Sequence, residues 1–444
     1  MDTLISNVTI VTMNEALDVI FGGHVGITDG KIAYIAKVPP KEQPAEIIDG
    51  TGMVLMPGLI NCHTHLATSL MRSLTDELSL TEALEQQLQR EAKMDSRCAK
   101  AAATIGVAEC LRFGVTSVSD LYYYPNATAE VIAESGMKAN LALSSYRFIA
   151  EQEEFDFKTD EQCAELRRVV EKWHGYDNGR IKIDAGIWAE YTSNYPLWES
   201  LSDYAAENGL GFQLHMAQSA DEDESCQDRT GLTQTELMSC HRVLNVPATI
   251  AGCNALSEMD QKILAKHKAT AVVLPLADAK QGRACADILS CVKSGMNVAL
   301  GTDGAVEAGN LDLFEVMRGA AMAVRASQGK ANVLPAQAAL MMATVSGARA
   351  QGRAQECGMI KEGMDADLCL VDFSAPHLMP CHNVPNALVF SAKGGDVAMT
   401  MVRGRKLYIN GKFPTLDISS AVQELMEYAI PKLFEEPKKE AANG

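Results

Sequence analysis

The chain has 444 residues, of which 47% are hydrophobic and 22% charged, values that are ordinary for a globular protein with a substantial core. Its formal net charge of −18 argues against nucleic acid or an anionic membrane as the main partner, because both need a basic surface. No apolar run approaches the ~18 residues of a membrane span, and no signal peptide is visible. The twelve cysteines form no CxxC pair, which predicts reduced thiols and a cytoplasmic location.

Short strands separated by turns are expected at the start of the chain. Residues 4–10 alternate between apolar and polar side chains, and residues 31–35 form a second apolar run. Gly22-Gly23 and Asp29-Gly30 mark turns between them. This pattern indicates a β module.

A rhythm of strand followed by helix begins near residue 53 and repeats. Eight such strands with helical crossovers predict an α/β fold built on a parallel, TIM-like (β/α)8 barrel. The alternative, an open doubly wound sheet, needs a glycine-rich nucleotide-binding turn that the sequence lacks. The candidate strands are residues 54–62, 116–121, 138–144, 181–188, 211–217, 248–253, 269–274 and 297–301, and helix-period segments include 95–113, 160–173, 260–266 and 311–325.

The last segment of the chain returns to β patterns after a helical stretch near residues 335–350. We therefore expect the two ends of the chain to meet in one small β-sandwich domain. The predicted division places the N-terminal half of the β-sandwich at residues 1–56, the metal-dependent barrel at 57–357, the C-terminal half of the β-sandwich at 358–416, and a C-terminal helix and tail at 417–444. Within the tail, residues 418–434 are amphipathic and predict a surface helix.

Two histidines separated by one residue close the first barrel strand, in the segment MPGLINCHTH (residues 56–65). On a strand, His63 and His65 point to the same face and can reach one point. Neutral imidazoles at this spacing suit a metal such as zinc or iron(II). The alternative is a pair of partly exposed loop histidines without a ligand role.

Two further candidate ligands follow other predicted strands. His215 lies at the end of the fifth strand, and Asp303 lies in a glycine-rich turn after the eighth. In a parallel barrel these positions converge on the C-terminal face, where the active site is built. Three imidazoles and one carboxylate leave a position for a water, whose pKa the metal lowers toward ~7, and Asp303 can accept the released proton. Taken singly, His215 could be a packed histidine and Asp303 a turn cap, but their joint placement favours a site for one metal.

These motifs resemble the amidohydrolase superfamily, and within it the cytosine-deaminase-like branch that includes methylthioadenosine/S-adenosylhomocysteine deaminases and triazine hydrolases. The resemblance covers essentially the whole chain. It implies hydrolysis of C–N or similar bonds in small, often heterocyclic, compounds, with His63, His65, His215 and Asp303 as ligands of one divalent metal, zinc or alternatively iron. The matching segments are MPGLINCHTH, LHMA (214–217), GTDG (301–304), NLDLF (310–314) and GMDADL (363–368), followed by VRGR (402–405) through Gly411.

Several positions depart from the pattern of that branch. Relatives carry a glutamate three residues after the fifth-strand histidine, where this chain has Gln218, and an amide cannot titrate to shuttle a proton. Gly252 replaces a histidine that orients water or stabilises developing charge. The segment WAEY (188–191) makes Glu190 a candidate catalytic acid or metal ligand, with a solvated loop acid as the alternative. After the seventh strand, LPL (274–276) replaces an Asn-Pro segment.

The sequence thus predicts a metal-dependent hydrolase that acts on C–N bonds of a small heterocyclic substrate. Hydrolytic deamination is the leading reaction, with Asp303 as base and with Gln218 and Glu190 as further catalytic candidates. The alternatives are a hydrolase of a different bond type and a weakened or inactive homologue that binds a metal or ligand. Its expected partners are the small-molecule substrate and a second copy of the chain in a homo-oligomer.

Overall fold

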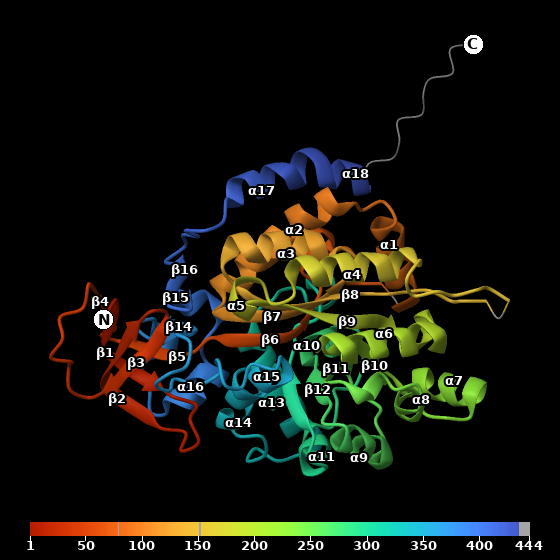
Figure 1. The fold of residues 1–444 in the computed structure, drawn as a ribbon. Helices are drawn as coiled ribbons and strands as arrows, with labels where there is room; N and C mark the ends of the chain where they lie inside the picture. The colour runs from red at the N-terminus through yellow and green to blue at the C-terminus, as the bar shows by residue number, and fades with distance from the viewer. Residues whose placement is uncertain (79, 151, 435–444) are drawn as a thin grey trace.

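A parallel eight-stranded sheet forms the centre of the protein and is surrounded by helices (Figure 1). The computed structural model describes residues 1–78, 80–150 and 152–434. The first and last strands of the sheet meet, because the backbone N–H of Asp303 donates to the carbonyl of His63 (3.1 Å), so the predicted (β/α)8 barrel is confirmed. In sheet order the strands are β13 (Asn297–Leu300), β12 (Thr270–Val273), β11 (Ala248–Gly252), β10 (Phe212–Met216), β9 (Ile181–Ala189), β8 (Lys138–Leu143), β7 (Val115–Tyr122) and β6 (Leu59–Thr64).

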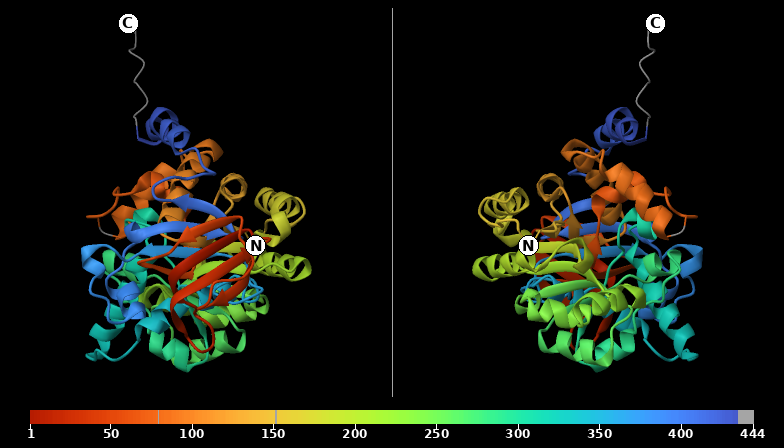
Figure 2. Two further views of the ribbon diagram at one scale, coloured as in Figure 1. Left: turned by 90° about the vertical axis from the view of Figure 1, so that its left-hand side faces the viewer. Right: turned by 90° about the vertical axis from the view of Figure 1, so that its right-hand side faces the viewer.

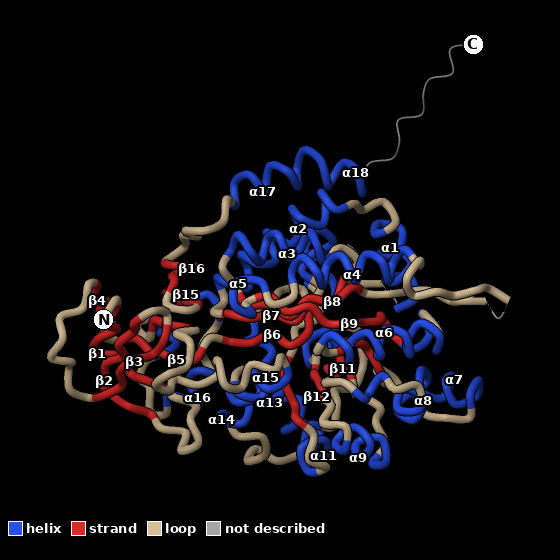
Figure 3. The backbone as a smooth tube through the Cα atoms, viewed as in Figure 1, coloured by secondary structure: helices blue, strands red, loops and turns tan. Residues whose placement is uncertain are grey.

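The helices lie outside the barrel strands and begin where the sequence offers caps (Figure 3). Asp95 accepts a hydrogen bond from the backbone of Cys98 and starts α2, while Asp160 caps α4 in the same way. The barrel region contains α1 (Leu80–Glu91), α2 (Ser96–Arg112), α3 (Pro125–Ser135), α4 (Glu161–Trp173), α5 (Tyr176–Gly179), α6 (Tyr195–Asn208), α7 (Ala220–Thr230), α8 (Gln234–Cys240), α9 (Glu258–Lys266), α10 (Pro275–Lys280), α11 (Ile288–Lys293), α12 (Ala305–Ala308), α13 (Leu313–Gln328), α14 (Ala336–Met342) and α15 (Val345–Ala350).

A second sheet is shared by the two ends of the chain, as Figure 2 shows from its N-terminal side. Ile5 and Leu55 from the first end share a buried apolar core with Leu370 and Met399 from the second. A separate sheet built from both ends of the chain is therefore confirmed, while the predicted β-sandwich domain bounds stay a prediction. Its strand order is β16 (Arg405–Ile409), β15 (Val397–Val402), β14 (Leu368–Asp372), β5 (Met53–Pro57), β1 (Thr3–Val11), β2 (Val19–Thr28) and β3 (Lys31–Ala36), with β4 (Glu46–Asp49) beside β1 and with α16 (Val384–Phe390) between β14 and β15.

The strand expected at residues 54–62 is two strands, and the single-strand prediction is wrong. β5 pairs with β1 and β14 in the terminal sheet, whereas β6 opens the barrel. Gly58 lies between them, and a Cβ at this position would lie 2.1 Å from Cγ2 of Thr116. The chain can pass from one sheet to the other here because glycine has no side chain to clash with the neighbouring strand.

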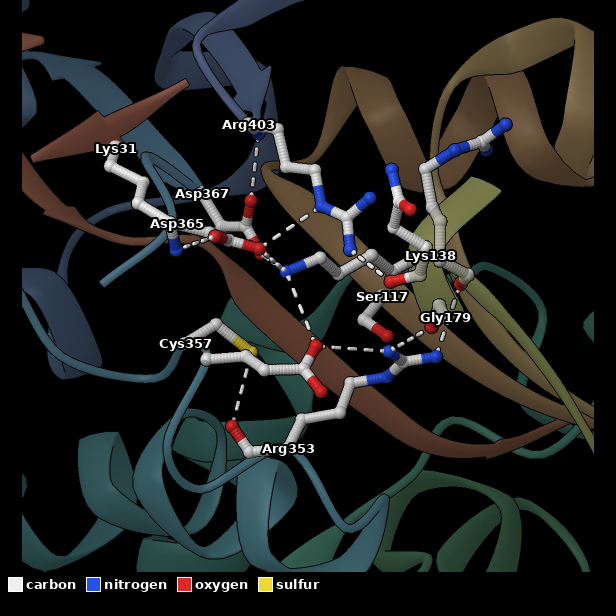
Figure 4. A network of polar contacts seen from close by, with 12 residues as sticks. Lys31, Ser117, Lys138, Gly179, Arg353, Cys357, Asp365, Asp367 and Arg403 are labelled. Carbon is white, nitrogen blue, oxygen red and sulfur yellow. Dashed lines mark hydrogen bonds and ion pairs between the residues drawn. The ribbon is translucent and has the colours of Figure 1, made fainter. Parts of the chain in front are cut away.

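A buried ion-pair network joins the terminal sheet to the end of the barrel opposite the predicted site (Figure 4). Lys138, at the start of β8, is fully buried, and its Nζ lies 2.6 Å from Asp367 and 2.8 Å from Asp365. Asp365 also pairs with Lys31 (2.9 Å) and Arg403 (3.0 Å). Burial opposes the charge on Lys138, but the neighbouring carboxylates outweigh it and raise its pKa.

A second buried cation binds the starts of two neighbouring barrel strands together. The guanidinium of Arg353 donates to the backbone carbonyls of Gly179 (2.7 Å), Ala139 (3.0 Å) and Arg180 (3.1 Å). It also pairs with Glu356 at 3.2 Å. This end of the barrel is therefore stabilised by polar contacts that are separate from the predicted site.

The C-terminal segment forms a helical layer over α2, as its amphipathic pattern predicts. It consists of α17 (Ile418–Glu424), one π-helical turn and α18 (Ile430–Phe434), and residues 435–444 of the predicted tail lie outside the described residues. Glu424 pairs with Arg97 (2.8 Å), and the Tyr428 hydroxyl donates to Asp95 (2.7 Å). Among the described residues, no helix has the length and apolar character needed to cross a membrane.

Candidate metal centre and active site

Four buried side chains meet at the C-terminal face of the barrel. They are His63 and His65 at the end of β6, His215 on β10, and Asp303 in the turn after β13. One potential ligand atom from each lies within 4.8 Å of all the others. Nε2 of His63 is 2.9 Å from Nε2 of His215, and Oδ1 of Asp303 is 3.1 Å from Nε2 of His65. The structure thus brings together the four residues that the sequence predicted as ligands.

Backbone carbonyls set the orientation of two of these imidazoles. Nδ1 of His65 lies 2.6 Å from the carbonyl oxygen of Leu121, and Nδ1 of His215 lies 2.9 Å from that of Trp188. A proton on each Nδ1 would satisfy these contacts and leave Nε2 as the ligand atom, as is usual for metal-binding histidines. Nε2 of His65 is buried and faces Oδ1 of Asp303 at 3.1 Å, but it meets no partner at good hydrogen-bond geometry. An orphaned nitrogen beside a carboxylate and two more imidazoles fits a divalent metal, and this donor set suits zinc.

The electrostatics of the cluster also favour a cation. Burial opposes ionisation of Asp303, but hydrogen bonds and charge from His63 and His65 hold its pKa well below the usual range. Burial likewise opposes protonation of His65, yet Asp303 raises its pKa to about 9. Burial and the two other imidazoles hold the pKa of His215 well below its usual value. A metal that binds here therefore replaces a proton in the space between the carboxylate and the imidazoles.

A cavity of about 560 Å³ opens above this cluster, with His215 and Asp303 in its lining. The Trp188 ring forms one wall and stacks on His65, with ring centroids 4.8 Å apart. Lys280 and Arg283 add positive charge to the lining of the cavity. The cavity is large enough for a small-molecule substrate, and it offers an aromatic face beside the candidate metal ligands.

Gln218 also lines this cavity, next to Gly252. Gly252 has φ +102°, and a Cβ there would lie 2.9 Å from Cγ of Gln218 and 3.1 Å from the carbonyl oxygen of Met216. A histidine could occupy position 252 only if the backbone moved, since L-residues rarely adopt this conformation. The side chain of Gln218 therefore occupies space that a side chain at position 252 would need.

Glu190 lies away from the lining of the metal cavity. It is 3% exposed, and its two carboxylate oxygens accept hydrogen bonds from Arg229 at 3.0 and 2.7 Å. The alternative of a solvated loop acid is wrong, because this carboxylate is buried and paired. Its predicted role in catalysis or metal binding stays a prediction.

Two buried carboxyl groups near the metal cavity were missed by sequence reasoning. Glu307 lines the cavity, its Oε2 is buried without a hydrogen-bond partner, and burial together with Asp303 raises its pKa to about 8. Burial raises the pKa of Asp278 to about 6, although Arg283 and Asn254 donate hydrogen bonds to it. A signal was present, because Asp278 and Glu307 follow the ends of β12 and β13 by five and seven residues, on the side of the barrel where active sites are built.

Comparison with known proteins agrees with these observations. The model of the amidohydrolase family matches residues 54–407. The chain belongs to the amidohydrolase family. The predicted superfamily is therefore confirmed, and with it a hydrolytic enzyme class.

Curated relatives match this family member over almost its full length. A 5'-deoxyadenosine deaminase from Methanosarcina acetivorans is 34% identical over 424 residues, which cover 95% of this chain and 96% of that protein. A 5-methylthioadenosine/S-adenosylhomocysteine deaminase from Moorella thermoacetica is 34% identical over 418 residues, covering 93% and 96%. The named relatives are thus deaminases of adenosine-like compounds.

Solved structures support the fold and the metal. An adenosine deaminase from Xanthomonas campestris with bound zinc superposes with a TM-score of 0.90 at 25% identity, covering 97% of this chain and 98% of that one. An atrazine chlorohydrolase from Arthrobacter aurescens, with a TM-score of 0.88 at 21% identity over 96% and 100% of the two chains, shows the same fold. Together with the buried three-histidine, one-aspartate cluster, the zinc-bound relative supports the predicted divalent metal, zinc.

Proposed function

We propose that this amidohydrolase is a zinc-dependent deaminase of adenosine-like nucleosides. The observation that carries the proposal is the buried His63, His65, His215 and Asp303 cluster at the base of a cavity with an aromatic wall. Relatives at 34% identity that are named as 5'-deoxyadenosine and methylthioadenosine deaminases support this substrate class.

In this proposal the four residues of the cluster would hold zinc, whose chemistry would be to make a bound water nucleophilic near neutral pH. Asp303, the only carboxylate in the cluster, accepts the proton that this water loses. Trp188 presents a flat face on which a purine can stack, and it excludes bulk water from the reacting carbon. Gln218 donates an amide hydrogen to a ring acceptor, which orients the purine without protonating it.

Glu307 is the residue that we propose as proton donor in place of the missing glutamate. Its pKa of about 8 keeps its carboxyl group protonated at neutral pH, and it lines the same cavity as Asp303 and Gln218. Glu190, by contrast, is proposed to act at a distance: its ion pair with Arg229 connects the end of β9 to α7.

A second candidate function is favoured by Gln218 and Gly252. With an amide and a bare backbone at these positions, the chain lacks the two groups that the resemblance to deaminases implies for proton transfer and for orienting the water. A catalytically weakened homologue would still bind zinc and a nucleoside, because the metal ligands and the cavity do not depend on either group.

Ammonia release from zinc-loaded protein tests these functions. The panel contains adenosine, 5'-deoxyadenosine, methylthioadenosine, guanine, a pterin, cytosine and an aminotriazine, with chelator-treated protein as the control. Deamination of the adenosine-like compounds that chelation abolishes is the expected result. Zinc and nucleoside binding without any product would establish the binding protein, and ammonia release from the triazine alone would contradict nucleosides as the substrate class.

Two further proposals concern the state of the protein in the cell. We propose a cytoplasmic location, which is supported by the twelve cysteines, all free of disulfides. The homo-oligomer expected from the sequence also stays a proposal. Fractionation and native mass spectrometry test the two, and a periplasmic fraction or a monomer would contradict them.

A further inference from the structure

A second cavity of about 630 Å³ lies beside the metal cavity and shares some of its lining. The residues common to both are Leu84 and Gln87 from α1 and Trp188 and Tyr191 from the end of β9 and the turn that follows. The two cavities therefore adjoin at Trp188, within reach of one molecule bound at the metal cluster.

A row of aromatic rings leads from the metal cluster into this second cavity. Trp188 stacks on His65 at a centroid distance of 4.8 Å and lies nearly parallel to Tyr123, 6.4 Å away. Tyr123 then contacts Tyr146 edge to face at 5.3 Å. Tyr123, Tyr146 and Trp188 all line the second cavity. The row offers ring faces and edges over its whole length, which is the surface that an apolar or aromatic group prefers.

Large apolar side chains around the second cavity are left in contact with water. Leu88 is 49% exposed, Tyr146 56% and Phe148 63%. Exposure of three such side chains around one hollow next to a catalytic cavity is a feature of ligand-binding surfaces. Because the hollow adjoins the metal cavity at four shared residues, one end of a small molecule bound at the metal cluster can fill it.

The charges of the second cavity disfavour an anionic group. Arg147 is the only basic residue in its lining, counted over the described stretches of the chain, and its guanidinium already pairs with Asp160 (2.6 Å) and Glu153. Glu91 adds a carboxyl group to the same lining, where burial raises its pKa. No unpaired cation in this described lining is available to a carboxylate.

We propose that the second cavity is a binding subsite for an uncharged apolar or aromatic substituent at the 5' carbon of the substrate. This rests on the proposed deamination of adenosine-like nucleosides. In such a nucleoside the reacting amino group and the 5' carbon are at opposite ends, so a purine held at the metal cluster directs its 5' substituent outward past Trp188. The enzyme therefore selects long apolar thioethers over substituents that carry an amino acid group.

Substrates that differ only at the 5' position test the subsite. Zinc-loaded protein is assayed with 5'-deoxyadenosine, methylthioadenosine, 5'-phenylthio-5'-deoxyadenosine and S-adenosylhomocysteine. We expect kcat/KM to rise along the first three compounds, with about a 10-fold gain for the phenyl group over the methyl group. S-adenosylhomocysteine should fall below the phenylthio compound. Equal kcat/KM for all four, or a preference for S-adenosylhomocysteine, overturns the subsite while the proposed deamination stands.

A variant pair and a binding measurement separate the subsite from catalysis. Phe148→Ala should lower the ratio of phenylthio to 5'-deoxy kcat/KM about 10-fold, whereas Phe21→Ala, which removes an equally exposed ring (63%) from β2 of the terminal sheet, should leave it unchanged. Calorimetry with the deaminated products, 5'-phenylthio-5'-deoxyinosine and 5'-deoxyinosine, needs no turnover. Tighter binding of the phenylthio product supports the subsite even if no substrate is deaminated. Equal affinities for the two products, or the same loss of the kcat/KM ratio in both variants, overturn the subsite.

Discussion

Substitution of the buried Lys138 by methionine tests the ion-pair network that joins the terminal sheet to the barrel. Methionine has a similar length and fits an apolar environment, so the main loss is the positive charge. Asp365 would keep Lys31 and Arg403 as partners, but Oδ2 of Asp367 has no hydrogen-bond partner besides this ion pair. Lys138→Met therefore takes the ion pair from the buried Asp367, whose Oδ1 still accepts a hydrogen bond from the backbone N–H of Arg403 (2.8 Å).

The structure supplies the magnitude and a matched control for this substitution. Removing one partner of a buried ion pair costs about 3–5 kcal/mol of unfolding free energy. The side chain of Lys31 pairs with the same Asp365 but is 57% exposed, so Lys31→Met should cost only ~0–1 kcal/mol. The free energy of unfolding of both variants is measured by urea denaturation followed by circular dichroism.

Three results decide this prediction. A difference of about 3 kcal/mol between the two lysine variants is expected. Asp367→Asn in the Lys138→Met background should recover some of the loss, because a neutral amide removes the uncompensated charge. Equal unfolding free energies for Lys138→Met and Lys31→Met would refute the conclusion that burial of this pair decides its contribution.

Four further predictions concern the active site. One zinc per chain should be found by elemental analysis, and two tightly bound ions, or none after supplementation, would contradict the single-metal cluster. Asp303→Asn should lower turnover by at least ~10²-fold because the amide cannot accept a proton; near-normal ammonia release with zinc still bound would remove Asp303 from the chemistry. In the Glu307→Gln background, Gln218→Glu should raise ammonia release from methylthioadenosine by ~10²-fold, and an unchanged rate would show that an acid at position 218 cannot deliver this proton. Glu307→Gln should lower kcat by ~10²-fold in the wild-type background, whereas a KM effect alone would assign Glu307 to binding.

Much of the barrel and its metal cluster could be predicted because the relevant signals are local. A strand that ends in His63 and His65 shows both its apolar run and its two ligands within ten residues, and Asp303 lies in an equally short motif. The parallel topology then requires the ends of these strands to meet. The predicted domain boundary at residue 57 lies beside Gly58, but the division of residues 54–62 into two strands was missed, because apolar residues continue on both sides and the change of sheet depends on contact with the distant Thr116.

The chemistry of the pocket wall was harder to predict because it depends on contacts between distant segments. Nothing in the local sequence around Glu190 shows that Arg229 will pair with it. The high pKa of Glu307 likewise arises from burial and from Asp303, which only the folded barrel provides. The row from Trp188 to Tyr146 combines residues of different loops, each of which is ordinary by itself.

The contact between Gly252 and Gln218 has a consequence for how this active site can change. Because the backbone at Gly252 has φ +102° and leaves no room for a Cβ beside Gln218, a histidine cannot be introduced there by a single exchange. Gln218→Glu needs no such movement, since the two side chains have the same shape. The two substitutions can therefore be made in only one order. Glutamate can be introduced at position 218 first, and histidine at position 252 only after the backbone at the end of β11 has been rebuilt. Laboratory evolution that starts from this chain should accordingly recover activity at position 218 and leave position 252 as glycine.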